Sequence, residues 1–148
     1  MKKVNVIILD DDADDRMLLQ EALDPGHFNI VASCSSGLDL LSFLAENPCP
    51  DMIIADFYLP GMNSLDVLRR IRLRCAEPSF LYVVLSGANV EQDPLIHENL
   101  HLFDAVMEKP DEYKKLISLN ADLISIARSR GKIQDEASGE MQGMAATG

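Results

Sequence analysis

The sequence has no long apolar run and little positive charge. No stretch approaches the roughly 20 apolar residues that a membrane helix needs, and the first residues lead into a strand-like run instead of a signal peptide. We therefore expect a cytoplasmic protein without membrane contact. Lysine and arginine number 13 against 24 aspartate and glutamate, a formal net charge of -11. Because nucleic-acid binding relies on basic side chains that neutralise phosphates, this balance argues against a nucleic-acid partner.

Cysteine and histidine are also scarce. The cysteines Cys34, Cys49 and Cys75 are odd in number and lack CxxC spacing, so neither a disulfide framework nor a zinc site is indicated. We expect reduced thiols in or near the core. His97 and His101 lie four residues apart without a cysteine or third histidine beside them, and we interpret them as a surface pair. No glycine-rich nucleotide-binding motif occurs.

The chain does contain enough apolar sequence for one packed domain. Of its 148 residues, 47% are apolar and 25% are charged, close to the averages of globular proteins. This length suits a single domain. From about residue 131 the periodicity ends and Gly, Ser and Ala become frequent. We therefore expect one domain over residues 1–130 and a flexible tail over 131–148, too short for an output domain.

Strand-like and helix-like segments alternate along this domain. The expected strands are continuous apolar runs: Val4–Leu9, Phe28–Ala32, Met52–Ala55, Phe80–Leu85 and Phe103–Met107. The expected helices have apolar residues at helical spacing: 14–23, 37–46, 64–74, a short or irregular one within 90–102, and one ending near 130. The alternation predicts an α/β fold, a doubly wound five-stranded parallel sheet sandwiched by five helices.

Capping residues mark two of the expected helix starts. Ser64 is a suitable N-cap for the helix over 64–74. Asp111 and Glu112 are acidic and suit the first turn of the last helix, where they would interact favourably with the helix dipole.

Polar residues follow four of the expected strands. Asp10 and Asp11 come after the first strand, Asp56 after the third, Ser86 after the fourth, and Lys109 after the fifth. Ligands of doubly wound sheets bind outside the carboxyl ends of the strands, so these five side chains should converge on one edge. Taken singly, each is an ordinary turn or cap residue, and the inference depends on their joint placement.

This set of side chains suits phosphoryl transfer. Three neighbouring carboxylates repel one another, and Mg²⁺, which prefers oxygen ligands, would relieve the repulsion. An aspartate in such a site can attack phosphorus, and Asp56, alone at the end of a buried strand, is best placed to do so. Lys109 can supply positive charge and Ser86 a hydroxyl donor to the transferred oxygens.

Four motifs resemble those of the response-regulator receiver domain, the CheY-like family of two-component signalling. They read LDDDADDR, ADFYLPGMNSLDVL, VVLSGA and VMEKP, within about residues 3–130. The resemblance implies a flavodoxin-like sheet with strand order 2-1-3-4-5. Counting back from Asp15 and Arg16 makes Asp10 and Asp11 the paired acids, with Asp12 beginning the loop.

The resemblance also assigns roles to individual residues. It implies that Asp10, Asp11, Asp56 and the backbone carbonyl of Tyr58 hold Mg²⁺, and that Asp56 accepts the phosphoryl group. It further implies that Lys109 pairs with the phosphate. Ser86 would move toward the phosphate as the switch, and Pro110 would follow Lys109 through a cis peptide bond.

The implied function is that of a single-domain response regulator, a signalling phosphoprotein that catalyses only its own phosphorylation and dephosphorylation. Its expected partners are a histidine kinase or histidine phosphotransfer protein and a downstream protein target, with a homodimer as a further possibility.

Three positions depart from the family pattern or tune it. Val106 stands where the family often has a switching aromatic residue, so the usual aromatic read-out is in doubt, and Phe103 is a candidate substitute. Tyr58 and Ala88 occupy positions that tune the lifetime of the aspartyl phosphate. We expect the bulky ring of Tyr58 to shield the phosphorus from water and slow hydrolysis.

Two other functions fit parts of the sequence. A phosphatase of the haloacid-dehalogenase type could use Asp10, Asp12, Ser86 and Lys109, although this leaves Asp56 unexplained. A receiver-like scaffold could bind partners without phosphate, through the fold alone.

Overall fold

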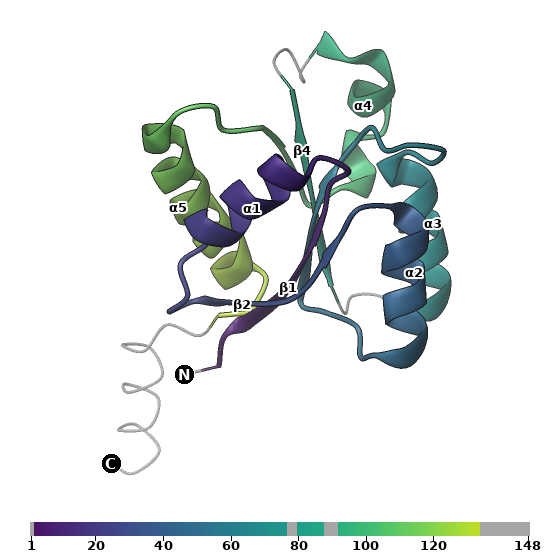
Figure 1. The fold of residues 1–148 in the computed structure, drawn as a ribbon, viewed down its shortest axis with the longest axis horizontal. Helices are drawn as coiled ribbons and strands as arrows, with labels where there is room; N and C mark the ends of the chain where they lie inside the picture. The colour runs from purple at the N-terminus through teal and green to yellow at the C-terminus, as the bar shows by residue number, and fades with distance from the viewer. Residues whose placement is uncertain (1, 77–79, 88–91, 134–148) are drawn as a thin grey trace.

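The computed structural model describes residues 2–76, 80–87 and 92–133 (Figure 1). Its strands are β1 (Val4–Leu9), β2 (Phe28–Cys34), β3 (Met52–Asp56), β4 (Leu81–Ser86) and β5 (Ala105–Glu108). Its helices are α1 (Ala13–Ala22), α2 (Gly37–Glu46), α3 (Ser64–Arg74), α4 (Pro94–Glu98), the short 3-10 helix η2 (Leu100–Leu102) and α5 (Tyr113–Ser129). Every expected strand is present, with its ends shifted by at most two residues. The short or irregular helix expected within 90–102 is α4 followed by η2.

The five strands form one parallel sheet in the order β2-β1-β3-β4-β5, which confirms the predicted topology. Helices α1 and α5 cover one face, and α2 and α3 cover the other (Figure 1). Successive residues of a strand point to opposite faces, so Ile7 and Leu9 join the core under α2 and α3, while Val6 and Ile8 join the core under α1 and α5. Burial of both faces explains the continuous apolar strands.

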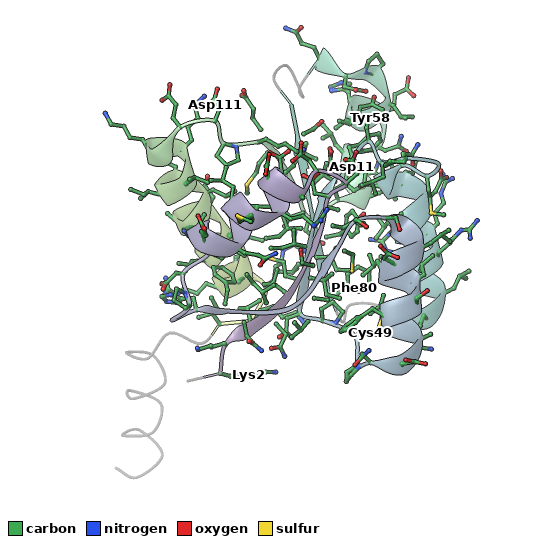
Figure 2. The ribbon with its side chains drawn as sticks, in the orientation of Figure 1. Lys2, Asp11, Cys49, Tyr58, Phe80 and Asp111 are labelled. Atoms are coloured by element: carbon green, nitrogen blue, oxygen red, sulfur yellow. A yellow bond between two sulfur atoms is a disulfide. The ribbon has the colours of Figure 1, made fainter. Side chains whose placement is uncertain are left out.

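The two ends of the sheet carry different kinds of residue. Asp11 and Tyr58 lie at the end where the strands finish, and Cys49 and Phe80 lie at the opposite end (Figure 2). Among the described residues, no helix is long and apolar enough to cross a bilayer.

The helix starts differ from the capping signals in the sequence. Asn63, and not Ser64, is the N-cap of α3, because its Oδ1 accepts the N–H of Asp66 at 3.0 Å. The prediction that Ser64 caps this helix was therefore wrong. Asparagine and serine cap helices about equally well, so the sequence could not choose between neighbours. Helix α5 begins at Tyr113, so Asp111 and Glu112 precede its first turn.

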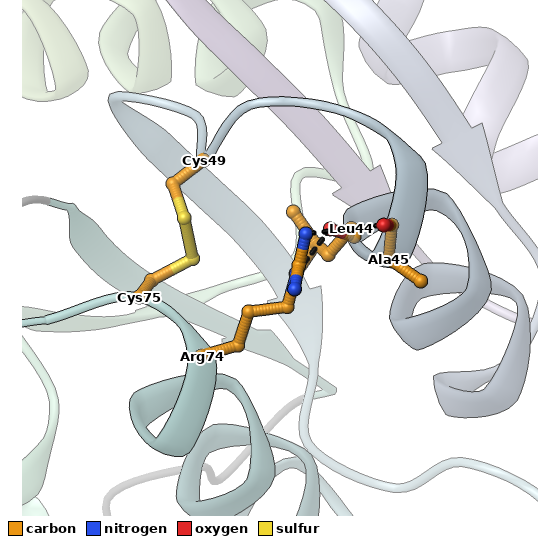
Figure 3. Close-up of a disulfide and its surroundings, with 5 residues drawn as sticks. All are labelled: Leu44, Ala45, Cys49, Arg74 and Cys75. Atoms are coloured by element: carbon orange, nitrogen blue, oxygen red, sulfur yellow. Dashed lines mark hydrogen bonds between the residues drawn. A yellow bond between two sulfur atoms is a disulfide. The ribbon is translucent and has the colours of Figure 1, made fainter.

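A disulfide joins Cys49, in the loop after α2, to Cys75, which follows α3 (Figure 3). The expectation of reduced thiols was wrong for these two cysteines, and Cys34 is free and buried. The partners lie 26 residues apart, and the packing of α2 beside α3 brings them together. Arg74 ties the same two segments by donating to the main-chain oxygens of Leu44 and Ala45, the latter at 3.1 Å.

The packed chain continues past α5. The N–H groups of Lys132 and Ile133 donate to the main-chain oxygen of Ala127 at 2.8 and 3.3 Å, and Ile133 is buried under α5. Three residues beyond the expected boundary at 130 therefore belong to the folded part. The rest of the expected tail, 134–148, lies outside the described residues.

Candidate functional site

The register of the sheet brings Asp56, Ser86 and Lys109 to one edge. Asp56, the last residue of β3, is paired with Leu85 of β4, so Ser86 lies one residue further along. Ser86 is paired with Glu108 of β5, directly before Lys109. The N–H of Lys109 donates to the main-chain oxygen of Ser86 at 2.6 Å, which fixes the lysine backbone beside β4.

Asp10 reaches the same edge from β1. Leu9, the last residue of this strand, is paired with Ala55, so Asp10 follows beside Asp56. The N–H of Asp10 donates to the main-chain oxygen of Cys34 at 3.1 Å, and its own carbonyl accepts a 2.7 Å bond from Arg16 Nη1. Both the N–H and the carbonyl of Asp10 are thereby held by hydrogen bonds.

Asp10, Asp11 and Asp56 form a carboxylate cluster. Each offers an oxygen atom, and the three atoms lie within 4.8 Å of one another. Asp10 is buried at 2% exposure and Asp11 is exposed. Carboxylates this close repel unless cations lie among them, and an all-oxygen set of this kind suits a hard divalent cation.

Lys109 contacts three carboxylates. Its Nζ lies 2.9 Å from Asp10 Oδ2, 3.0 Å from Asp15 Oδ2 and 3.0 Å from Asp56 Oδ2. Burial by itself would lower the pKa of Lys109, but the hydrogen bonds to the three carboxylates outweigh it and raise the pKa above the ordinary lysine value. The lysine is therefore a fixed positive charge at this edge. Asp15 was not predicted as a site residue, because it lies in the first turn of α1 and not at the end of a strand.

Burial also acts on the pKa of Asp56. It raises the pKa of this carboxyl above the ordinary aspartate value, the hydrogen bond and charge of Lys109 act against the rise, and the charge of Asp10 adds to it. Without a further cation, the ionised form of Asp56 is thus less stable here than in water.

The loop after β3 is tied back to Asp56 through Ser64. The Ser64 hydroxyl donates to the main-chain oxygen of Asp56, and its N–H donates to that of Phe57 at 2.7 Å. Gly61 allows the turn between them, since its φ of 74° lies in the region that other residues rarely adopt. Ser64 is fully buried, so the start of α3 is anchored to the end of β3.

Tyr58 points from this loop toward α4. Its hydroxyl donates to Asp93 Oδ2, while Asp93 Oδ1 caps α4 by accepting the N–H of Leu95 at 3.0 Å and of Ile96 at 3.3 Å. The ring packs edge-on against Phe57 with centroids 4.9 Å apart, and 51% of the residue remains exposed. The hydrogen bond to Asp93 raises the pKa of Tyr58. Tyr58 therefore links the loop after β3 to the start of α4.

Two other predicted residues lie near the site without joining the carboxylates. Val106 is half-buried in β5, paired with Val84, and packs against the core under α2 and α3, as Phe103 does. Pro110 lines a shallow hollow together with Lys109, Asp10, Asp15, Leu18, Leu19 and Leu85. Ala88 lies outside the described residues.

The carboxylate of Asp12 caps α1 and is not one of the three carboxylates in the cluster. Its Oδ1 accepts the N–H of Asp14 at 2.8 Å and of Asp15 at 3.1 Å, so this carboxylate is the N-cap of α1. The N–H of Asp12 in turn donates to Asp10 Oδ1 at 2.9 Å. The pairing of Asp10 with Asp12 that a haloacid-dehalogenase site would need therefore finds no support in this geometry.

Sheet order and site define a doubly wound α/β protein with an acidic site and a lysine at the carboxyl edge. The chain belongs to the response regulator receiver domain family, whose model matches residues 6–119.

Curated relatives cover different shares of the chain. The sensory/regulatory protein RpfC of Xanthomonas campestris pv. campestris is 28% identical over 125 residues, which are 83% of this chain and 17% of that protein. The probable chemotaxis protein CheY of Rhizobium etli is 27% identical over 86 residues, which are 58% of this chain and 66% of that protein. The chain thus spans only a small part of the larger relative.

Solved structures share the fold. A chain in the crystal structure of the P1 domain of CheA3 in complex with CheY6 from R. sphaeroides matches with a TM-score of 0.69 and 27% identity, covering 84% of this chain and 96% of that one. The response regulator domain of Thermotoga maritima CheB matches with a TM-score of 0.70 and 20% identity, covering 90% and 100%.

Proposed function

We propose that this receiver domain accepts a phosphoryl group on Asp56 from a histidine kinase or a histidine phosphotransfer protein, in a Mg²⁺-dependent reaction, and that it signals through protein–protein contacts that depend on phosphorylation. The observation that carries the proposal is the placement of Asp56. Its carboxylate ends a buried strand, with Lys109 Nζ 3.0 Å away and the carboxylates of Asp10 and Asp11 beside it.

The carboxylate cluster fits a divalent cation. Lys109 brings one positive charge to Asp10, Asp15 and Asp56, so negative charge remains at the edge even before Asp11 is counted. We assign Asp10, Asp11, Asp56 and the main-chain carbonyl of Tyr58 as the ligands of Mg²⁺. When bound, Mg²⁺ would neutralise charge on the transferred oxygens.

Asp56 and its neighbours have defined roles in the reaction. A carboxylate oxygen of Asp56 forms the new P–O bond while the P–N bond of the donor phosphohistidine breaks and its electron pair returns to the imidazole nitrogen. Lys109 pairs with a phosphoryl oxygen, and the Ser86 hydroxyl donates to another. Ser86 is buried at 7% exposure, and its main-chain oxygen accepts the N–H of Lys109, so the two residues lie side by side at this edge.

Exposed apolar side chains near the site suit protein partners. Met17 and Leu18 are 59% and 38% exposed on α1, and Leu18 lines the hollow beside Lys109, so we assign this helix to donor docking. The pairing of a CheA3 P1 domain with CheY6 in a structural relative supports a partner of this kind. Leu95 and Ile117, on α4 and α5, suit a downstream target or a second copy. A kinase and a target inside the cell would place the protein in the cytoplasm.

Intact mass spectrometry after incubation with Mg²⁺ and acetyl phosphate tests the phosphoacceptor. We expect a single hydroxylamine-sensitive phosphoryl adduct that is lost in Asp56→Asn and when Mg²⁺ is chelated. A folded wild-type protein without an adduct at any Mg²⁺ concentration would favour the phosphate-independent scaffold. Turnover of a chromogenic phosphate ester that survives in Asp56→Asn would instead favour a phosphatase.

A further inference from the structure

Asp15 lies close to the proposed phosphoacceptor but belongs to none of the roles assigned above. It is in the first turn of α1, and its N–H is held by the capping carboxylate of Asp12 at 3.1 Å. This cap lies at the start of the helix, and the Asp15 side chain reaches Lys109 from the first turn. The distance from Asp15 Oδ2 to Lys109 Nζ is 3.0 Å, equal to that from Asp56 Oδ2.

The three contacts of Lys109 use all of its hydrogen-bond donors. An ammonium group has three N–H bonds, and here they meet the carboxylates of Asp10, Asp15 and Asp56. A phosphoryl oxygen on Asp56 needs a donor from the same ammonium group. While the phosphoryl group approaches, Asp56 still carries its charge, so one of the three carboxylates must release Lys109 before the transfer.

The solvent exposure of the three side chains indicates which carboxylate releases Lys109. The side chain of Asp15 is 41% exposed, against 3% for Asp10 and 13% for Asp56. A released carboxylate needs water to replace the lost hydrogen bond, and only the exposed one can obtain it at low cost. Asp15 is the partner that can separate from Lys109 without leaving a buried charge unpaired.

We propose that Asp15 is a positioning residue that holds Lys109 in the unphosphorylated state and gives way to the phosphoryl group, so that it slows phosphorylation by competing for the lysine. This inference rests on the proposed function of Asp56. Release of the Asp15 contact frees one donor of Lys109 while Asp10 keeps the ammonium group at the site.

The test compares Asp15→Asn with Asp14→Asn, which removes the same charge from the same helical turn at a residue that is not an ion-pair partner of Lys109 in the part of the chain that the structure describes. The rate of adduct formation is measured over a range of acetyl phosphate concentrations at saturating Mg²⁺. Partly exposed ion pairs are weak, so we expect Asp15→Asn to phosphorylate about two- to fivefold faster. Asp14→Asn should match the wild type, and Asp15→Glu should restore the slower rate.

A second readout addresses the contact without phosphoryl transfer. The NMR signal of the Lys109 ammonium group in the unphosphorylated protein should shift in Asp15→Asn and stay in place in Asp14→Asn. Equal acceleration by both asparagine variants, or a slower Asp15→Asn, would overturn the role of Asp15 while leaving Asp56 as the acceptor. No adduct on the wild type would overturn the proposed function, and the role of Asp15 with it.

Discussion

The hydroxyl of Ser64 donates a hydrogen bond to the main-chain oxygen of Asp56, joining the first residue of α3 to the residue that we propose as phosphoacceptor. Ser64 is fully buried, and its own carbonyl accepts a 3.3 Å bond from the Tyr82 hydroxyl. The start of α3, the end of β3 and the buried Tyr82 of β4 are thus joined by hydrogen bonds through one residue.

Ser64→Ala removes this hydroxyl and leaves a buried carbonyl with one donor fewer. We expect the free energy of unfolding to fall by about 1–2 kcal/mol, because the main-chain oxygen of Asp56 loses this hydrogen-bond donor without gaining water in its place. Urea unfolding followed by circular dichroism measures the change. Ser42→Ala, on the exposed face of α2, is the matched control and should stay within about 0.5 kcal/mol of the wild type. Equal stability of the two variants would show that the Ser64 contact adds nothing.

Mg²⁺ should stabilise the folded protein. A ligand present at ten times its dissociation constant, and binding only the folded state, adds about 1.4 kcal/mol. We expect a higher melting temperature for the wild type in Mg²⁺ and little change for Asp11→Asn, whose carboxylate is one of the three in the cluster. Asp122→Asn, exposed on α5, should respond as the wild type does. An Asp11→Asn protein that responds fully would remove Asp11 from the ligand set.

The pH dependence of stability should report the burial of Asp56. Its pKa is raised in the folded state, mainly by burial, so the folded protein holds this proton more tightly than the unfolded chain. The contribution of Asp56 to the free energy of unfolding is therefore fully present below about pH 4. It is lost as the pH rises through the pKa of Asp56 in the folded state. Without metal at pH 7, Asp56→Asn should therefore be more stable than the wild type, and the difference should vanish in acid. Urea unfolding in EDTA, from acid to pH 7, measures the difference in stability between the variant and the wild type. An Asp56→Asn protein that is less stable than the wild type at pH 7 would contradict the prediction.

Reduction of the Cys49–Cys75 disulfide should lower stability. The bond joins residues 26 apart, and a loop of this size is expected to contribute about 3.5 kcal/mol through the unfolded chain. Urea unfolding with and without a reductant measures the loss. Cys49→Ser should have the stability of the reduced wild type, with or without a reductant.

Under native, non-reducing conditions we also expect no alkylation of Cys34 at pH 8, because burial, with the charge of Asp39 adding to it, raises the pKa of Cys34 to about 11.

Tyr58 should lengthen the life of the aspartyl phosphate. Its ring is held by the hydroxyl contact with Asp93 and the edge contact with Phe57, two residues after Asp56, and we expect it to hinder water there. We expect Tyr58→Asn to lose phosphate several-fold faster, and Tyr58→Phe to fall between it and the wild type. Decay of the adduct after removal of the phosphodonor measures the lifetime. Hydrolysis by Tyr58→Asn at the wild-type rate would exclude shielding by the ring.

The main features of the site were predictable because they depend on topology. In a parallel sheet the strand ends meet at one edge, so the sequence alone groups Asp10, Asp56, Ser86 and Lys109. The motifs within which they lie then distinguished a receiver from other α/β proteins, and the family model agrees.

The missed features depend on angles and packing that no local pattern encodes. The contact of Asp15 with Lys109 requires the particular start of α1 that Asp12 caps. The hydrogen bond between Tyr58 and Asp93 joins two loops 35 residues apart. The pairing of Cys49 with Cys75 follows from the packing of α2 against α3, which cysteine spacing alone cannot indicate.

The disulfide also makes part of the backbone a closed covalent ring that contains β3, α3 and the proposed phosphoacceptor. Trypsin cleaves after lysine and arginine, and neither occurs between Arg16 and Arg69. Asp56 and Cys49 are therefore in one tryptic peptide, while Cys75 begins the peptide after Arg74. Without a reductant these two peptides remain joined. A phosphate mapped on the oxidised protein will therefore appear on a cross-linked species, and a search for the linear Asp56 peptide alone would miss it.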